Sequence, residues 1–203
     1  MASRLKRPGT RKADDRQPIA FASPQSVPDQ PLLSIGMIFR NDKRSIRRCL
    51  DALAPLRKAI PCQLVIVDTG STDGSRQIAE QYADVLLNFA WIGDFAAARN
   101  AGLEHCTGTW FMQLDTDEYL DPDIGPLIEF LSGPKSASFN SAALIMREYE
   151  TLDMDGAYIE HLMPRLFRRL PDLRFVGAIH EVISPTGDAY PLYKAVLHHD
   201  GYA

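Results

Sequence analysis

A regular alternation of short apolar runs and helical patterns is the feature that most constrains the fold of this chain. The apolar runs lie at residues 32–39, 63–68, 84–89 and 109–115. Each run is short and continuous, which is typical of a strand buried on both faces of a sheet. Between the runs, apolar residues recur at helical intervals, as at Ile46, Leu50 and Leu53. The alternation predicts a mainly parallel, Rossmann-like α/β sheet with helices on both faces.

The pattern changes after Pro122. One short helix is expected within residues 123–133. Segments that alternate apolar with polar residues, as strands do, follow at 142–150, 157–169, 173–184 and 193–202. We therefore expect one domain at 31–203, in which a β-rich half, 122–203, is appended to an α/β half, 31–121.

Residues 1–30 differ in composition from the rest of the chain. They contain six Lys or Arg residues, four prolines and few large apolar side chains. Such a segment buries too little apolar surface to offset the entropy of ordering it. We expect a disordered basic tail, which is either a solvated extension or a peripheral contact with anionic lipid or a protein partner.

Charge and cysteine content exclude several classes of protein. The 22 basic and 26 acidic residues give a net charge of −4, which argues against a nucleic-acid-binding protein. Cys49, Cys62 and Cys106 lie far apart, as expected of reduced thiols in a cytoplasmic protein. No apolar run approaches the ~18 residues of a membrane span, and the N-terminus lacks the apolar core of a secretory signal.

Four carboxylates crowd the end of the last apolar run in the α/β half. They are Asp115, Asp117, Glu118 and Asp121. Carboxylates this close raise one another's pKa unless a positive group lies among them. Either Asp115 caps a turn and Asp117 faces water, or the two hold a divalent cation such as Mg²⁺ or Mn²⁺. The apolar residues before them and the extra Glu118 favour the cation.

Polar residues follow three of the predicted strands at the same end. They are Arg40, Asn41 and Asp42 after the first strand, Asp68 and Thr69 at the end of the second, and Asp115, Thr116 and Asp117 after the fourth. In parallel sheets, ligands bind beyond the carboxyl ends of the strands. We therefore expect these residues to share one binding site.

Several segments, taken in order, resemble a known family. SIGMIFRND, VIVDTGSTDGS, FAAARNAG and FMQLDTDE resemble the nucleotide-sugar half of family-2 glycosyltransferases with the GT-A fold. RLFRRLPDLRFVGAIHEVI and HHDGY resemble a bacterial branch with lipopolysaccharide-core glucosyltransferase-like and repeat-bearing members. The resemblance covers residues 34–202. It implies a hexosyltransferase-like, inverting enzyme of cell-envelope glycan synthesis, in the cytoplasm or at the inner face of the membrane. The donor would be a nucleoside-diphosphate sugar, UDP-linked, and the acceptor a hydroxyl of a glycan, a lipid-linked glycan or a peptide.

The resemblance also implies roles for the residues at the strand ends. Asp117, assisted by Asp115 and with His199 as a further ligand, would hold Mn²⁺ or Mg²⁺ against the diphosphate. The nucleoside would lie among the residues that end the strands, which are Phe39, Arg40, Asn41, Asp42, Asp68, Thr69 and Thr116. Thr69 stands where many members carry an aspartate that contacts the base.

Further residues are assigned on the acceptor side and on the small-residue helix that Asp94 opens. Arg99 matches an arginine that reaches the nucleotide; the alternative is a structural salt bridge to Asp68 or Asp94. Glu181 is the candidate base that deprotonates the acceptor hydroxyl, and the alternative is a solvent-facing strand-edge residue. Arg165 lies on a segment that the family uses near the acceptor pocket, and the alternative is a solvent-facing strand residue. His180 would orient the acceptor or contact phosphate, and the alternative is a half-buried residue of a sheet. Because neighbouring side chains on a strand point to opposite faces, only one of residues 198 and 199 should reach the site.

Two other functions fit the Asp-x-Asp motif. One is a module that binds a nucleotide sugar without turning it over. The other is an aspartyl-phosphate phosphohydrolase, whose site requires a Thr or Val where this chain has Tyr119 and lies on the first strand rather than the fourth.

Overall fold

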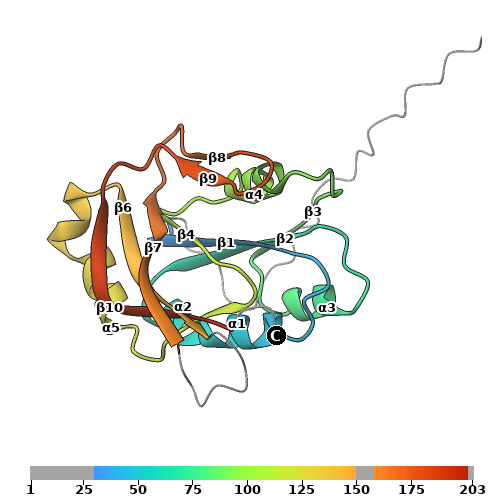
Figure 1. Cartoon of the computed structure of the whole chain (residues 1–203), viewed down its shortest axis with the longest axis horizontal. Coiled ribbons are helices and arrows are strands. Elements are labelled where there is room, and N and C mark those ends of the chain that lie inside the picture. The colour runs from blue at the N-terminus through green and yellow to red at the C-terminus, as the bar shows by residue number, and fades with distance from the viewer. Residues whose placement is uncertain (1–29, 150–157, 201–203) are drawn as a thin grey trace, which may run out of the picture.

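The computed structural model describes residues 30–149 and 158–200. The expected basic tail lies almost entirely outside these ranges. The main feature is an eight-stranded sheet with the strand order β3-β2-β1-β4-β7-β6-β10-β5 (Figure 1). Its strands are β1 (Leu33–Phe39), β2 (Cys62–Asp68), β3 (Val85–Asn88), β4 (Trp110–Gln113), β5 (Glu118–Leu120), β6 (Ser141–Tyr149), β7 (Tyr158–Arg168) and β10 (Ala189–His199). A separate small hairpin pairs β8 (Arg174–Val176) with β9 (Val182–Ser184).

The first four strands form the predicted parallel sheet. β1 pairs with β2 and β4, and β2 pairs with β3, all in parallel register. Every residue of β2 is buried, and in β1 only Ile38 is less than fully buried. Burial on both faces explains why these strands appear in the sequence as continuous apolar runs.

The β-rich half extends this sheet instead of forming a separate layer. β7 runs antiparallel between β4 and β6. β10 then pairs in parallel with β6 and in antiparallel with the short β5. The sheet is therefore continuous across both halves, and β7 of the β-rich half directly adjoins β4.

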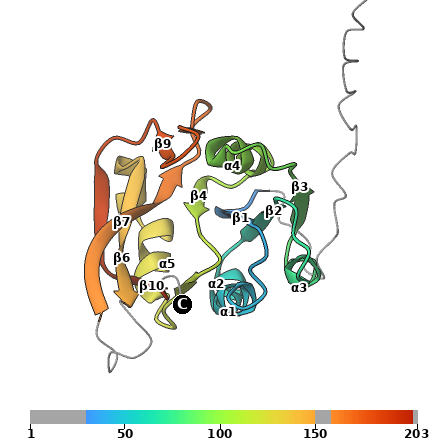
Figure 2. The same cartoon turned by 45° about the vertical axis from the view of Figure 1, so that its right-hand side comes forward.

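Helices cover both faces of the sheet, as Figure 2 shows for α4 on one side and α1 and α2 on the other. The helices are α1 (Ile46–Ala52), α2 (Ala54–Ala59), α3 (Ser75–Ala79), α4 (Phe95–Leu103) and α5 (Gly125–Ser132), with a 3₁₀ turn at η1 (Pro134–Ser138). As predicted, Asp94 caps α4, because its Oδ1 accepts a hydrogen bond of 2.8 Å from the Ala97 amide. None of the helices in the described ranges has the length and apolarity that a membrane crossing needs.

Two apolar cores, one on each face, fix the sheet. The larger packs α1, α2 and α5 against the sheet, and it includes Leu50, Ile66 and Phe130. The smaller lies beneath α4 and the β8–β9 hairpin. Gly102 allows α4 to approach the sheet closely, because a Cβ atom there would lie 2.9 Å from Val67 Cγ2.

The carboxyl ends of three parallel strands meet at one edge of the sheet. Phe39 at the end of β1 lies opposite Asp68 at the end of β2. Beyond β4, the Leu114 amide donates to the Gly36 carbonyl at 3.1 Å, so the acidic segment begins alongside the second half of β1. The predicted site residues are thereby brought together from distant parts of the sequence.

Candidate active site

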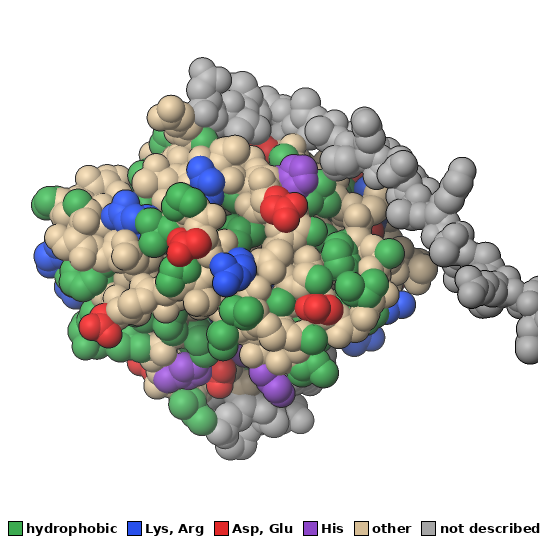
Figure 3. Space-filling view, turned by 90° about the horizontal axis from the view of Figure 1, so that it is seen from above, with side chains coloured by type: hydrophobic (Ala, Val, Ile, Leu, Met, Phe, Trp, Pro, Cys, Tyr) green, Lys and Arg blue, Asp and Glu red, His purple; other side chains and the backbone are tan. Residues whose placement is uncertain are grey.

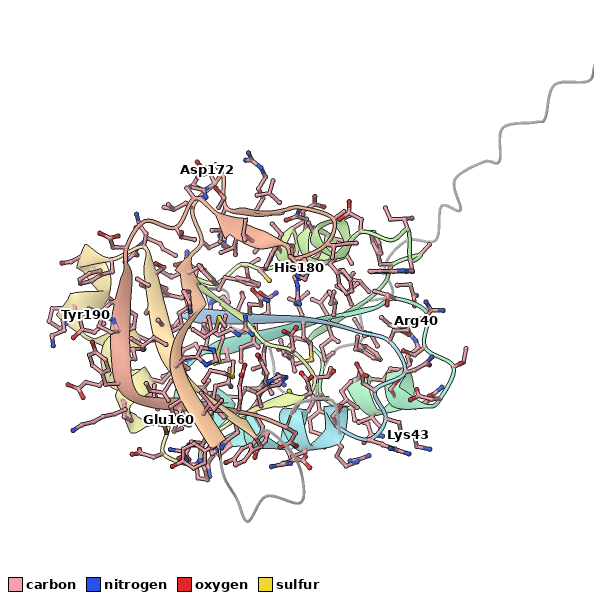
Figure 4. The ribbon with its side chains drawn as sticks, in the orientation of Figure 1. Arg40, Lys43, Glu160, Asp172, His180 and Tyr190 are labelled. Atoms are coloured by element: carbon pink, nitrogen blue, oxygen red, sulfur yellow. The ribbon has the colours of Figure 1, made fainter. Side chains whose placement is uncertain are left out.

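A cavity of about 650 Å³ opens at this edge of the sheet. Most of the site residues predicted from the sequence line it: Phe39, Arg40, Asp42, Thr69, Arg99, Asp115, Thr116, Asp117 and His199. Strands β6 and β7 supply the opposite wall, including Glu148 and Arg165. Figure 4 shows Arg40 beyond the carboxyl end of β1 and His180 beside α4. The cavity is large enough for a nucleotide with an attached sugar.

Two arginines supply the positive charge that the acidic segment requires. Arg99 Nη2 donates to Asp115 Oδ1 at 2.7 Å, and Arg165 Nη2 lies 3.7 Å from Asp115 Oδ2. Burial alone would raise the pKa of Asp115, but the two guanidinium groups outweigh it and hold the pKa below its ordinary value. The carboxylate of Asp115 therefore already pairs with arginines. The carboxylate of Asp117 is the one of this motif that is more available to a cation.

Glu118 is the second acid in this network. Its carboxylate is buried and pairs with Arg165, and its Oε2 accepts a hydrogen bond of 3.0 Å from the Asp115 amide. Burial raises the pKa of Glu118 to about 7, although Arg165 opposes this rise. Because Arg165 lines the cavity and is only 13% exposed, the alternative of a solvent-facing residue at this position is wrong.

Arg99 connects two segments that lie 66 residues apart in the chain. Its Nε donates to Glu181 Oε1 at 2.6 Å while its Nη2 binds Asp115, so one guanidinium on α4 holds two carboxylates. Arg99 thus forms salt bridges, but its partners are not Asp68 or Asp94, which the structural alternative named. Arg99 is 10% exposed, which makes it a buried organising cation at the back of the cavity.

Glu181 lies at the end of the β8–β9 turn and is not part of the cavity wall. The turn contains two residues in the left-handed region, Gly177 at φ 98° and His180 at φ 54°. Its path is fixed to α4 by the Phe95 amide, which donates to the Ala178 carbonyl at 2.9 Å. Glu181 is 12% exposed, so it is not the solvent-facing residue of the alternative reading, whereas His180 is exposed.

Asn41 and Asp68 shape the wall of the cavity without lining it. Asp68 Oδ1 accepts hydrogen bonds from the Gly70 and Ser71 amides at 3.0 and 2.8 Å, and Oδ2 pairs with Arg76. Asn41 Oδ1 accepts from the Thr72 amide at 2.8 Å. Neither residue lines the cavity, and these contacts of their oxygens hold the loop after β2.

Asp117 and His199 form the group best suited to a divalent cation. Their Oδ2 and Nε2 atoms lie 3.3 Å apart on the cavity wall, and the hydrogen bond to Asp117 raises the pKa of His199. Among the residues that the structure describes, no set of three or more His, Cys, Asp or Glu side chains is arranged to hold a metal. A carboxylate and an imidazole fit Mn²⁺ that takes its other ligands from water and phosphate oxygens.

His198 points away from the cavity, as strand alternation predicts. Its Nδ1 lies 2.8 Å from the Tyr149 hydroxyl, and its Nε2 lies 3.0 Å from Asp121 Oδ2. Asp121, the last of the four clustered acids, is therefore held by a histidine outside the cavity.

Sequence reasoning missed several residues of the cavity wall: Trp91, Phe95, Met146, Glu148 and Met163. The last three reach the site because β7 inserts between β4 and β6, a pairing that no local pattern reveals. Trp91 and Phe95 precede and begin α4, and their rings pack edge to face at 4.7 Å. A Trp shortly before the start of the helix that Asp94 opens was the one local signal available for this pair.

Replacing Arg99 with methionine should lower the free energy of unfolding by about 2–4 kcal/mol, because two carboxylates would lose their shared buried cation. Urea denaturation measures this change. Arg147→Met is the matched control, since Arg147 also pairs with a carboxylate, that of Glu160, but at the surface. The control should cost less than about 1 kcal/mol. Equal effects of the two substitutions would contradict the organising role of Arg99.

The part of the chain that forms the floor of the cavity also matches a known protein family. The model of the family described as glycosyl transferase family 2 matches residues 34–151, more than half of the chain. The chain belongs to glycosyltransferase family 2. The matched region contains every strand end that forms the floor of the cavity.

Curated relatives include named glycosyltransferases. A TPR repeat-containing protein of Synechococcus elongatus is 34% identical over 152 residues, which cover 74% of this chain and 35% of that protein. Glycosyltransferase SunS of Bacillus subtilis is 26% identical over 189 residues, covering 86% of this chain and 40% of SunS. The lipopolysaccharide core biosynthesis glycosyltransferase LpsC of Rhizobium meliloti is 30% identical over 107 residues, covering 50% of this chain and 37% of LpsC. The chain thus spans about two fifths or less of the length of these relatives.

Solved structures confirm the predicted GT-A fold. TarS of S. aureus, residues 1–349 in complex with UDP, aligns with a TM-score of 0.51 and 21% identity over 60% of this chain and 37% of that chain. The mannosyltransferase PcManGT of Pyrobaculum calidifontis, in complex with GDP-Man and Mn²⁺, aligns with a TM-score of 0.50 and 19% identity over 76% of this chain and 48% of that chain. At these identities the likeness concerns the fold.

Proposed function

We propose that this chain is a metal-dependent, inverting glycosyltransferase that moves a sugar from a UDP-linked donor to an acceptor hydroxyl. The observation that carries the proposal is the cavity at the carboxyl ends of β1, β2 and β4, where Asp117 and His199 face one space. Residues 31–121 would bind the donor and residues 122–203 would supply the acceptor side. The relation to LpsC supports a role in cell-envelope glycan synthesis.

The nucleoside end of the cavity is formed by β1 and the residue after β2. Thr116 Oγ1 donates to Asp42 Oδ2 at 2.7 Å, which fixes that carboxylate against the acidic segment. Thr69 Oγ1 donates its proton to the Phe39 carbonyl at 3.0 Å, so its lone pairs can accept from a base. A uracil N–H is a suitable donor for that oxygen, so Thr69 would take the place of the usual aspartate in a site for UDP.

The diphosphate end is assigned to Asp117 and His199. These side chains would hold Mn²⁺ or Mg²⁺, and the bound ion would neutralise the charge that develops on the departing diphosphate. Asp115 and Arg99 would keep the acidic segment in place beside it. Their mutual ion pair makes this wall rigid, so Asp117 need not reorganise when the donor binds.

The acceptor side requires a base that takes the proton of the attacking hydroxyl. We assign this role to Glu181, whose carboxylate is oriented by Arg99 at 2.6 Å. Glu148 is the competing candidate, because it lines the cavity and its Oε1 lies 3.8 Å from His199 Nδ1. In an inverting reaction the hydroxyl attacks the anomeric carbon from the side opposite the leaving diphosphate while the carboxylate receives its proton. The acceptor would be a glycan, a lipid-linked glycan or a peptide.

Calorimetric titration with UDP and GDP, each with Mn²⁺ or with a chelator, tests the donor assignment. UDP should bind in the presence of Mn²⁺ and should bind about tenfold or more weakly with the chelator, because two of the metal's ligands come from the protein. UDP affinity that does not depend on Mn²⁺, or tighter binding of GDP than of UDP, would contradict the assignment.

Incubation with UDP-hexoses then separates turnover from binding. A glycosyltransferase releases UDP as the sugar is transferred to an acceptor or to water. A module that only binds would leave the donor intact, and a phosphohydrolase would release phosphate from simple monoesters. Family membership argues against the phosphohydrolase, and the release of UDP decides between the other two functions.

A further inference from the structure

The carboxylate of Glu148 differs from the other carboxylates on the cavity wall. Four of those acids are engaged in hydrogen bonds of 3.3 Å or less with protein groups: Asp42, Asp115, Asp117 and Glu118. Within the described residues the Glu148 carboxylate has no hydrogen bond, and its Oε1 lies 3.8 Å from His199 and 3.9 Å from His161. Figure 3 shows histidine and acidic side chains gathered at the lower edge of the view. Because the Glu148 side chain is 43% exposed, its oxygens are available to a ligand in the cavity.

Glu148 belongs to a face of the β6–β7 pair that continues outward from the cavity. Met146 and Glu148 of β6 line the cavity, and the residues directly opposite them on β7 are His161 and Ile159. Directly opposite residues of antiparallel strands share one face of the sheet. His161 and Ile159 therefore lie on the cavity side, where they are 37% and 51% exposed. This face combines a carboxylate and an imidazole with apolar side chains.

The charges beside Glu148 disfavour an anionic ligand. His199 lies between two carboxylates, 3.3 Å from that of Asp117 and 3.8 Å from that of Glu148, so a protonated His199 neutralises at most one of them. Arg147 precedes Glu148 in the chain, but it pairs with Glu160 on the other face of the sheet. A phosphate or carboxylate brought next to Glu148 would therefore be repelled.

The arginines that line the cavity do not reverse this balance. Arg99 pairs with two carboxylates, and Arg165 is shared between two others at the back of the site. Arg40 lies beyond the carboxyl end of β1, at the end of the cavity that we assign to the nucleoside (Figure 4). The cavity side of the β6–β7 pair therefore offers hydrogen-bonding groups for an uncharged ligand.

We propose that Glu148 and His161 bind the hydroxyl groups of an uncharged pyranose, which is the unit of the acceptor that receives the transferred sugar. A pyranose carries hydroxyls around its rim and C–H groups on its two faces. Its hydroxyls would donate to the carboxylate and bond to the imidazole, while Ile159 packs against a C–H face. A serine or threonine side chain offers a single hydroxyl and would leave one of the two polar groups without a partner. This inference rests on the proposed function and excludes a peptide as its acceptor.

Saturation-transfer NMR of the full chain with UDP and Mg²⁺ tests the proposal, because it detects weak binding without turnover. The probes are the methyl glycosides of glucose, galactose and mannose, the anionic methyl glucuronide, and acetyl-serine amide. At least one neutral glycoside should bind, and it should bind more tightly than the glucuronide and the serine amide. Glu148→Ala and His161→Ala should each weaken glycoside binding, the first by about tenfold or more because a hydrogen bond to a charged group is lost. Glu148→Lys should bind the glucuronide in preference to the neutral glycosides.

Glu160→Ala is the matched control. Glu160 also lies on β7 (Figure 4) and is 41% exposed, but it pairs with Arg147 on the other face of the sheet. This control should bind the glycosides as the unaltered chain does. Equal binding by Glu148→Ala and the unaltered chain would overturn the proposal, as would a preference of the unaltered chain for the glucuronide or the serine amide.

Calorimetry with UDP and Mn²⁺ on the same samples keeps this test separate from that of the proposed function. A chain that binds UDP but none of the methyl glycosides contradicts only the inference about the acceptor. A chain that does not bind UDP contradicts the proposed function itself.

Discussion

Replacing Asp117 with alanine is expected to reduce sugar transfer by about a thousandfold or more. The substitution removes the only carboxylate that we assign to the metal, and the loss of several kcal/mol of charge stabilisation corresponds to that factor. The dependence of UDP binding on Mn²⁺ should disappear as well. Asp117 is about a third exposed, so thermal unfolding should change little. Release of UDP from a UDP-hexose measures the effect.

Asp121→Ala is the matched control for this prediction. Asp121 belongs to the same acidic segment, but its carboxylate is paired with His198 outside the cavity. Transfer by the control should stay within a few-fold of the unaltered enzyme. Equal losses of transfer in both variants would mean that the acidic segment affects transfer only by maintaining the fold. Unchanged turnover in Asp117→Ala would mean that Asp117 does not hold the metal.

Replacing Glu181 with glutamine is expected to slow transfer by about a hundred- to ten-thousandfold, the usual contribution of a general base. Glutamine can still accept the hydrogen bond from Arg99, so the turn should keep its place. Binding of UDP with Mn²⁺ should remain near normal, because Glu181 lies outside the nucleotide end of the cavity. Initial rates at saturating donor, together with calorimetry, separate these two effects.

Glu148→Gln provides the comparison, because Glu148 is the other carboxylate on the acceptor side and lines the cavity directly. If Glu181 is the base, Glu148→Gln should alter the KM for the acceptor more than kcat. The reverse result, with a large loss of kcat in Glu148→Gln and a small one in Glu181→Gln, would transfer the role of base to Glu148.

The α/β half could be predicted from the sequence because its signals are local. A strand buried on both faces must be apolar along its length, and the helices between such strands repeat every three or four residues. The position of β7 could not be predicted in this way. Its alternating pattern shows that it is a strand, but the choice of β4 and β6 as its neighbours depends on packing between distant segments.

The same contrast holds in the site. Parallel strands place their carboxyl ends at one edge, so Arg40, Thr69 and Asp117 could be grouped from their positions alone. The partners of Arg99 could not be identified, because Glu181 reaches it from a turn 82 residues further along the chain. The side chains of Asn41 and Asp68 have the chemistry of nucleoside contacts, so the sequence predicted them as such. In the structure their oxygens accept hydrogen bonds from the loop after β2.

The proposed function requires that Asp117 hold a divalent ion against the diphosphate of the donor. A crystal structure of the chain with UDP-glucose and Mn²⁺, with the anomalous signal of manganese recorded, tests it most directly. We expect a manganese peak in contact with Asp117, His199 and the phosphate oxygens, and a uracil beside Thr69. A peak elsewhere, or a nucleotide bound without contact to Asp117, would contradict it.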